Sequence, residues 1–281
     1  AWQRVARDFS RRGKEAGFFA YQRPMMCHRL ALIILVLSTL IPMAGCGSKV
    51  KGPVCPIRTG VITSQTGKHA AGGKEHMQGQ AMAIEEINAA GGILGCPVEL
   101  VVKDDASVPL QAQMAVRELV EEEKVLVIIG AFSSAATMPA AGVANAYQIP
   151  FLVHIASSDL ITAQGYEWVF RINAPSGEYA RTAFDFIQEV RNALHINTLA
   201  VVYDDTLFGE SAAVAAVENA RERGIEVVAY EAYRSGLDDY TALLAEVRRV
   251  NPDVIYFASY LREAKLLMEQ CQALNINPKL Y

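Results

Sequence analysis

Apolar, strand-like runs alternate with amphipathic helical segments along most of this chain, and this alternation constrains the fold more than any other feature. Strand-like runs occupy residues 57–63 (IRTGVIT), 98–103 (VELVVK) and 125–130 (VLVIIG), and a segment with helix-like spacing follows each, the first over residues 74–90. Continuous apolar strands joined by helices are typical of a parallel sheet covered on both faces. The sequence therefore predicts an α/β fold built on doubly wound parallel sheets.

A second series of the same kind begins near residue 176 and predicts a second lobe. An aromatic strand followed by a Pro/Gly break (GYEWVFRINAPSG, residues 165–177) separates the two series, and we expect the hinge near Pro175. The predicted lobes span residues 56–173 and 174–281. Because the final residues, PKLY, begin another strand, we expect the second lobe to be incomplete at its C-terminus and the chain to be the front part of a longer protein.

The N-terminal region has the pattern of an export signal. Residues 25–46 contain a short positive start (MCHR), an apolar core (LALIILVLSTLI) and small residues before a cysteine (PMAGC). The apolar run is short for a membrane span and typical of a signal peptide. An uncleaved membrane anchor and a buried helix are the alternatives. Residues 1–24 precede the signal and are interpreted as a non-native or mis-set extension, and residues 47–55 as a tether.

The end of this signal resembles a bacterial lipobox, which implies that Cys46 carries lipid and anchors the protein to a membrane. That pattern prefers leucine three residues before the cysteine, where this chain has Met43. The charge balance argues against a nucleic-acid partner, because residues 1–45 hold seven basic and two acidic residues while the remainder holds 19 basic and 28 acidic.

Two cysteines, Cys55 and Cys96, each stand immediately before a proline and a strand-like run. If the two strands are parallel neighbours, these thiols start adjacent strands and could form a disulfide, which an oxidising compartment permits. Two unpaired thiols at strand ends are the alternative. The cysteine spacing gives no zinc pattern.

Ligands of doubly wound sheets sit beyond the carboxyl ends of the strands. Two of the loops expected there, residues 131–137 (AFSSAAT) and 154–162 (HIASSDLIT), are rich in small and hydroxyl residues. Hydroxyls and helix-start N–H groups bind carboxylates, since those N–H groups have no partner inside the helix. For Ser133 alone an ordinary helix cap is favoured. The second serine pair, Ser157 and Ser158, favours a site.

From about Ile57 to Tyr281 the chain resembles bacterial periplasmic binding proteins of the leucine/isoleucine/valine type. The matching stretches are, in order, VITSQTGKHAAGG with INAAGGILG, VVKDDASVPLQA, IIGAFSSAATMPA, IPFLVHIASSDLIT with GYEWVFRI, VYDDTLFGE and DVIYFASY. The resemblance implies a type I periplasmic binding fold, a two-lobed clamp without catalytic chemistry, cofactor or metal. It also implies that the clamp captures a small solute outside the cytoplasmic membrane and delivers it to an ABC permease complex.

The resemblance also implies roles for individual residues. Ser134 and Ser158 would hold a ligand carboxylate, and the Ala156 carbonyl would accept from a ligand ammonium, with Ser133 and Ser157 beside them. Phe208 and Tyr260 would close over the ligand, although Phe208 could simply pack and Tyr260 could be a surface residue.

This chain departs from the family pattern at one wall of the site. The family often carries an aromatic residue at the position of Gly72, so we expect a wider or less apolar pocket there. The acidic residue that pairs with a ligand ammonium would come after Tyr281, and Glu178 is a weaker candidate for that charge than for a solvated helix start.

Other motifs receive structural interpretations. Gly67–Lys68 follows a strand as in a phosphate-binding loop, but the stretch lacks the earlier glycine and the following hydroxyl residue that this motif requires. The sequence also has no G-x-S-x-G nucleophile elbow. His69 and His76 are expected to be solvated rather than metal ligands. His154 either lines the pocket or ends a strand.

Paired acidic residues also end two of the predicted strands. Asp104 and Asp105 are expected in a turn and a helix cap, and the same holds for Asp204 and Asp205 at the end of a second-lobe strand.

Two function classes follow from the sequence. The favoured one is the binding component of an importer of a branched-chain amino acid or a related small carboxylate or amide. The alternative is the ligand-sensing extracellular domain of a signalling receptor. An enzyme is not expected.

Overall fold

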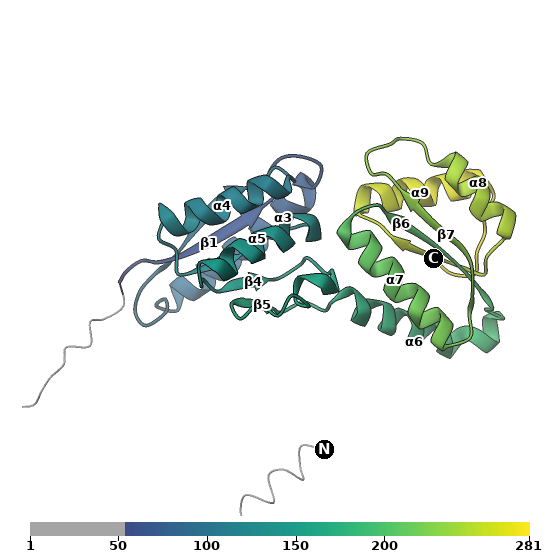
Figure 1. The fold of residues 1–281 in the computed structure, drawn as a ribbon, viewed down its shortest axis with the longest axis horizontal. Helices are drawn as coiled ribbons and strands as arrows, with labels where there is room; N and C mark the ends of the chain where they lie inside the picture. The colour runs from purple at the N-terminus through teal and green to yellow at the C-terminus, as the bar shows by residue number, and fades with distance from the viewer. Residues whose placement is uncertain (1–53) are drawn as a thin grey trace, which may run out of the picture. The chain divides into compact units, whose positions relative to one another are not determined.

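The computed structural model describes residues 54–281 (Figure 1). The predicted extension (1–24), signal peptide (25–46), Cys46 and most of the tether lie outside the described residues. The α/β class predicted from the sequence is confirmed, because every named strand pairing in the described residues is parallel and helices connect most of the strands.

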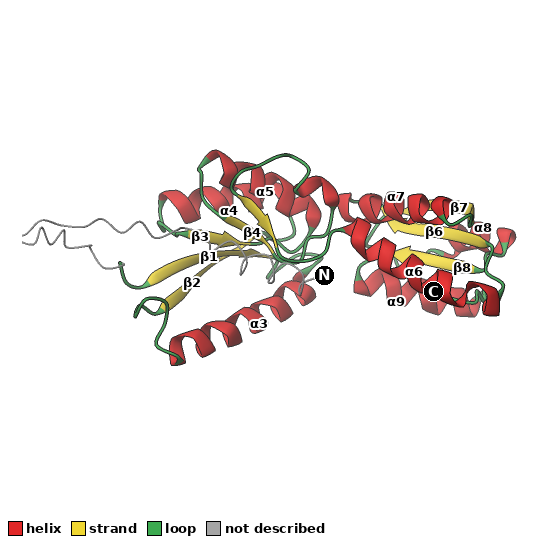
Figure 2. Ribbon diagram, turned by 90° about the horizontal axis from the view of Figure 1, so that it is seen from below, coloured by secondary structure: helices red, strands yellow, loops and turns green. Residues whose placement is uncertain are grey.

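The first sheet has the strand order β2-β1-β3-β4-β5. Its strands and helices are β1 (Ile57–Thr63), α3 (Ala70–Ala89), β2 (Val98–Asp104), α4 (Pro109–Glu121), β3 (Val127–Ile129), α5 (Ser134–Ala146), β4 (Phe151–Val153), a 3₁₀ turn η2 (Asp159–Ile161) and β5 (Val169–Arg171). Figure 2 shows α4 and α5 on one face of this sheet and α3 on the other. The register from Ile57↔Val98 to Thr63↔Asp104 brings the carboxyl ends of β1 and β2 to the same edge.

The second sheet has the order β7-β6-β8. Its elements are α6 (Ser176–Leu194), β6 (Thr198–Asp204), α7 (Leu207–Glu222), β7 (Glu226–Tyr233), α8 (Thr241–Val250), β8 (Val254–Ala258) and α9 (Leu261–Ala273). The final segment adds one parallel bridge, between Leu280 and Val254. The predicted lobe boundary between residues 173 and 174 falls between β5 and α6 and stays a prediction.

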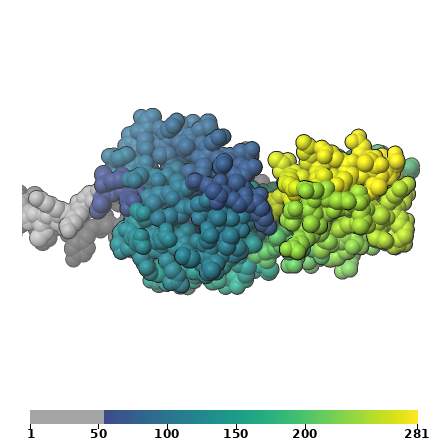
Figure 3. All heavy atoms as spheres, turned by 90° about the horizontal axis from the view of Figure 1, so that it is seen from above, coloured from purple at the N-terminus to yellow at the C-terminus, as the bar shows by residue number. Residues whose placement is uncertain are grey.

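Alternating side chains of β6 build two cores, one on each face of the second sheet. Leu199 and Val201 pack with α6 and α7, whereas Ala200 and Val202 pack with α8 and α9. This is the burial expected of a parallel strand covered on both faces. The first sheet has its own core, formed mainly with α4 and α5. In the space-filling view the residues of the second sheet and its helices make up the green-to-yellow part of the surface (Figure 3).

Helix α3 begins earlier than the sequence predicts. We expected a loop through Gly73, but the helix starts at Ala70 and includes Gly72 and Gly73. A Cβ atom at Gly73 would lie 2.0 Å from the carbonyl oxygen of Ser64. The glycine that reads as a loop residue in the sequence therefore serves close helix–strand packing.

Candidate functional site

Ser133 caps helix α5, as its favoured interpretation predicted. Its backbone is extended (φ −87°, ψ 148°), and its hydroxyl accepts a hydrogen bond from the Ala136 N–H at 3.3 Å. The Thr137 hydroxyl donates to the Ser133 carbonyl at 2.8 Å and fixes the same turn. This arrangement satisfies a helix-start donor within the protein.

Ser134 and Ser158 join the two serine-bearing loops. The Ser134 hydroxyl accepts from the Ser158 N–H at 3.2 Å. Both residues are buried, and the Ser158 hydroxyl has no hydrogen-bond partner among the described residues. A buried hydroxyl without a partner is uncommon in folded proteins, because a polar group that is removed from water and makes no hydrogen bond costs free energy.

The Ala156 carbonyl is engaged within the protein. It accepts from Arg171 Nη1 at 2.5 Å and from Asn173 Nδ2 at 3.3 Å, and Arg171 Nη2 also reaches the Ser158 carbonyl at 2.7 Å. Two donors occupy both lone pairs of a carbonyl oxygen. The role of Ala156 as acceptor for a ligand ammonium stays a prediction, and its carbonyl already has donors within the protein. Arg171, the last residue of β5, contacts this loop and was not singled out from the sequence.

Ser157 connects the same loop to the start of α6. Its carbonyl accepts from the Ser176 N–H at 2.7 Å and from the Ser176 hydroxyl at 3.1 Å. The two serines also approach through their hydroxyls at 3.3 Å. The starts of α5 and α6 therefore both lie beside the loop that follows β4.

A cavity of about 360 Å³ opens beside these serines. Its walls come from both sheets and their loops: Phe132, Ser134, Ile155, Ala156, Ser157, Ser176, Tyr179, Phe208, Ala212, Tyr256, Phe257, Ala258 and Tyr260. Five residues predicted for the ligand site line it, whereas Ser133 and Ser158 do not. The volume lies in the range of small-molecule sites.

Phe208 and Tyr260 form an aromatic side of the cavity. Their ring centroids lie 4.9 Å apart, and both residues are half-buried. Burial, followed by the nearby Asp204 carboxylate, raises the pKa of Tyr260, so its hydroxyl stays neutral. Tyr260 does not match the surface alternative considered from the sequence, and Phe208 lines the cavity as well as packing against Tyr260.

His69 is buried, and the prediction that it is solvated was wrong. It is 7% exposed, and its ring lies 4.3 Å from the Tyr260 ring and 5.7 Å from the Phe132 ring. Burial, with a smaller effect from Lys68, lowers the pKa of His69 to about 4. The early start of α3 places this residue at the helix N-terminus, where the sequence pattern showed only a loop.

The rings of His76 and His154 contact each other, and His76 also contacts Phe132. Their rings lie 5.3 Å apart, and His76 meets Phe132 edge-on at 5.4 Å. Burial, followed by His76, lowers the pKa of His154 to about 4. Burial also lowers the pKa of His76, which is half-buried. The Gln80 side-chain amide lies 3.4 Å from Nε2 of His154.

Phe132 supplies the wall that Gly72 was expected to leave open. A Cβ atom at Gly72 would lie 2.4 Å from Cζ of Phe132, so the phenyl ring occupies the space that a side chain at residue 72 would take. The expectation of a wider or less apolar wall was wrong. The signal was present in the sequence as the one bulky residue within a loop of small ones.

The acidic candidates have structural partners. Asp104 accepts from the N–H groups of Gln65, Thr66 and Ala106, as expected of a turn residue. Asp105 is buried, accepts from the Ser64 hydroxyl at 2.6 Å and has its pKa raised by burial.

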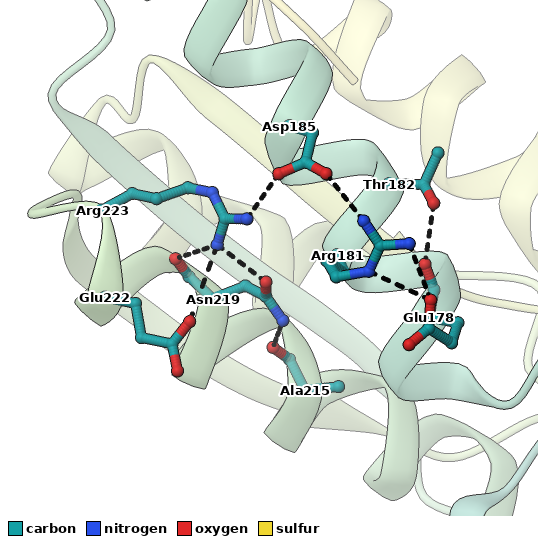
Figure 4. A network of polar contacts seen from close by, with 8 residues as sticks. All are labelled: Glu178, Arg181, Thr182, Asp185, Ala215, Asn219, Glu222 and Arg223. Atoms are coloured by element: carbon teal, nitrogen blue, oxygen red, sulfur yellow. Dashed lines mark hydrogen bonds and ion pairs between the residues drawn. The ribbon is translucent and has the colours of Figure 1, made fainter. Parts of the chain in front are cut away.

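Glu178 belongs to a surface network and does not line the cavity. It pairs with Arg181 at 2.7 Å, and Arg181 pairs with Asp185 at 3.0 Å. Figure 4 shows how Asp185 continues this network to Arg223 and so links α6 to α7. The predicted alternative of a solvated helix start fits Glu178 better than a ligand charge.

A disulfide joins Cys55 to Cys96, which precede the neighbouring strands β1 and β2, with Cα atoms 5.2 Å apart. Within residues 54–281 no group of three or more His, Cys, Asp or Glu side chains is arranged to hold a metal ion. A helix with the length and apolar character of a membrane span is also absent from the described part of the chain.

Comparison with known proteins gives consistent matches over this region. The sequence model of a family described as "Periplasmic binding protein" matches residues 56–281. An "Amino acid binding protein" of Pseudomonas aeruginosa is 32% identical over 211 residues, which cover 75% of this chain and 56% of that protein. The Leu/Ile/Val-binding protein of Escherichia coli is 28% identical, covering 77% and 58%.

Solved structures agree with the sequence matches. A leucine-binding protein of Thermotoga maritima superposes with a TM-score of 0.72 at 27% identity, covering 79% of this chain and 62% of that one. A branched-chain amino acid transporter substrate-binding protein of Streptococcus pneumoniae, in complex with isoleucine, gives 0.70 at 26% identity, covering 80% and 63%. The chain thus spans little more than half the length of the curated relatives it matches.

Proposed function

The chain belongs to the periplasmic binding protein family, and from this premise we propose that it is the extracytoplasmic solute-binding component of an ABC-type importer. Its solute would be a branched-chain amino acid or a related small carboxylate or amide. The observation that carries the proposal is the cavity beside Ser134, Ser157 and Ser176, with an aromatic side formed by Phe208 and Tyr260.

The serine side of the cavity suits a carboxylate. Ser134 is the first residue of α5 and Ser176 the first residue of α6, so two helix N-termini lie at this end. Helix-start N–H groups carry partial positive charge, and hydroxyls add donors that can turn toward an anion. Ser158 does not line the cavity, but its N–H donates to the Ser134 hydroxyl and its own hydroxyl has no partner among the described residues, so it would serve as a further donor if the ligand reaches past Ser134.

The aromatic side of the cavity suits an apolar group. Aromatic rings line much of the remaining wall, and burying an apolar side chain against them favours binding by about 25 cal/mol per Å² of area removed from water. We propose that the lobes at residues 56–173 and 174–281 close over the solute, which is bound without being chemically changed. The relatives named for leucine, isoleucine and valine binding support this solute class.

We also propose export and lipid anchoring through Cys46, followed by delivery of the solute to a membrane permease. The lipobox-like stretch before Cys46 supports this step, and the disulfide between Cys55 and Cys96 suits an oxidising compartment. Mass spectrometry of protein extracted from membranes should find a diacylated Cys46 at the N-terminus. A free N-terminus upstream of that residue would contradict the anchor.

The ligand site is tested by thermal shift and calorimetry with a panel of amino acids, simple amides, urea and aromatic acids. A ligand at about 100 times its Kd adds roughly 2.7 kcal/mol of stability, which raises the Tm of a chain this size by about 5–10 °C. The double variant Ser134→Ala, Ser158→Ala should lose about 1.5–3 kcal/mol of binding free energy per contact.

Ser133→Ala is the matched control for that experiment. It removes a serine from the same loop, and it should lower the free energy of unfolding by about 1 kcal/mol through loss of the helix cap. It should leave affinity close to the wild-type value, because the Ser133 hydroxyl is already engaged by the Ala136 N–H, whereas the Ser158 hydroxyl has no partner among the described residues. Unchanged affinity in the double variant would rule out the serine site.

A further inference from the structure

Gly72 and the ring of Phe132 are in direct contact at the wall of the cavity. A Cβ atom at residue 72 would approach Cζ of Phe132 to 2.4 Å and Cε2 to 2.6 Å, which is closer than real Cβ contacts come. Gly79 lies on the same helix, α3, and a Cβ atom there would meet nothing within 4 Å. The two glycines therefore differ in what they touch and share their helical setting.

Phe132 has neighbouring rings on several sides. His69 lies 5.7 Å away, His76 meets it edge-on at 5.4 Å, and Tyr260 lies 6.2 Å away. The helix backbone at Gly72 lies against another side, and the ring also lines the cavity. A side chain at residue 72 would therefore push the Phe132 ring toward the space where a ligand sits.

Phe132 also stands two residues before Ser134, within the loop that starts α5. Its ring therefore borders the end of the cavity that holds the serines. If the ligand carboxylate lies at the serines, an apolar group close to it would lie near this ring.

From this geometry we propose that Gly72 and Phe132 act together as the specificity-determining pair that limits the size of the ligand's apolar side group. This inference rests on the proposed function and refines it. The pair selects small carboxylates with a compact side group. Because residue 72 has no side chain, the Phe132 ring takes its present position, and that position limits the size of the side group. Pocket contacts of this kind discriminate by about 10- to 200-fold for one methylene group.

The test uses four variants: Gly72→Ala, Gly79→Ala, Phe132→Ala, and the double variant Gly72→Ala, Phe132→Ala. Affinities for L-valine, L-leucine and L-phenylalanine are measured by calorimetry. Gly72→Ala should weaken binding at least tenfold for the largest amino acid that the wild type binds, and less for valine. Gly79→Ala should bind like the wild type.

Removing the ring should act in the opposite direction. Phe132→Ala should improve phenylalanine relative to valine by about tenfold, which is the effect of one to a few methylene groups of added space. Adding Gly72→Ala to Phe132→Ala should change affinity little, because the alanine then meets no ring. This loss of the Gly72 effect in the double variant is the signature of a coupled pair.

Melting temperatures test the coupling without any ligand. Gly79→Ala should raise the Tm, since alanine restricts the unfolded chain more than glycine does. Gly72→Ala should lower it through overpacking against Phe132, and the double variant should melt no lower than Phe132→Ala.

Three outcomes would overturn the proposal. If the wild type binds these amino acids and Gly72→Ala keeps the same order of affinities, the size limit is wrong while the proposed function stands. If the effects of the two substitutions simply add, in affinity or in Tm, the residues do not act as a pair. If the wild type binds none of the three amino acids, the proposed solute class fails and the size limit fails with it.

Discussion

Acid should destabilise this protein well above the pH at which its carboxylates are protonated, because the buried His69 and the half-buried His154 are held in neutral form. The pKa of His69 and that of His154 are each lowered from 6.5 to about 4. Between about pH 6.5 and pH 4 each of these histidines is protonated in the unfolded chain and neutral in the folded chain. Stability is therefore unaffected above about pH 6.5 and falls as the pH drops from there toward 4.

The magnitude follows from the size of the shift. A shift of one pKa unit corresponds to about 1.4 kcal/mol, and lowering the pH from 7.5 to 5.0 realises about 2 kcal/mol per histidine. The two together predict a loss of about 4 kcal/mol in the free energy of unfolding. The charges that act on His69 are Lys68, which lowers its pKa, and Asp204 and Glu263, which raise it less than burial lowers it.

Urea unfolding at the two pH values measures this loss. His69→Gln cannot gain the proton, so its loss between pH 7.5 and 5.0 should be about 2 kcal/mol instead of about 4. His195→Asn is the control, because His195 is exposed and ends α6 in a left-handed conformation that asparagine tolerates. This variant should keep the full wild-type loss.

Carboxylates do not obscure the comparison. Hydrogen bonds from Lys279, Asn197 and Thr198 lower the pKa of Asp253 to about 2 despite its partial burial, so its contribution disappears only below the pH range used. Burial raises the pKa of Asp105, but this effect is common to wild type and variants. Equal losses in wild type and His69→Gln would refute the inference that a buried neutral imidazole packs against Tyr260.

Two further changes test parts of the scaffold. Replacing both Cys55 and Cys96 by serine removes a disulfide whose cysteines are 41 residues apart in sequence. The chain-entropy relation then predicts a loss of about 4 kcal/mol in the free energy of unfolding. A denaturation midpoint equal to that of the oxidised wild type would contradict this prediction. Arg171→Lys keeps the charge but cannot bridge the carbonyls of Ala156 and Ser158 in the same fixed geometry. Calorimetry should show roughly tenfold weaker ligand binding for this variant, and a wild-type affinity would mean that the loop holds its shape without the guanidinium.

Much of the fold follows from local pattern. The run IRTGVIT coincides with β1 (Ile57–Thr63), because it is rich in β-branched residues, which favour strands. The start of α3 did not follow, because glycine at residues 72 and 73 normally marks a loop. Here the two glycines lie inside the helix and admit the Phe132 ring and the Ser64 backbone, two contacts that only the tertiary structure defines.

The candidate site was predictable to a similar extent. Hydroxyl and small residues at strand ends placed Ser134 and Ser157 at a cavity, since the carboxyl ends of parallel strands meet at one edge of a sheet. The donors that the Ala156 carbonyl already has within the protein could not be predicted from its own loop. The two groups that engage its carbonyl, Arg171 and Asn173, come from the following strand and the residues just after it.

The error at Gly72 shows why a pocket wall cannot be inferred one position at a time. A missing side chain predicts an opening only if no neighbour can fill it, and dense packing makes filling the more stable outcome. Phe132 stands 60 positions along the chain from Gly72, beyond the reach of any local pattern, yet its ring lies where a Cβ atom at residue 72 would be. The free space at such a wall is determined by both residues together. A change at either one should alter ligand preference in a way that depends on the other.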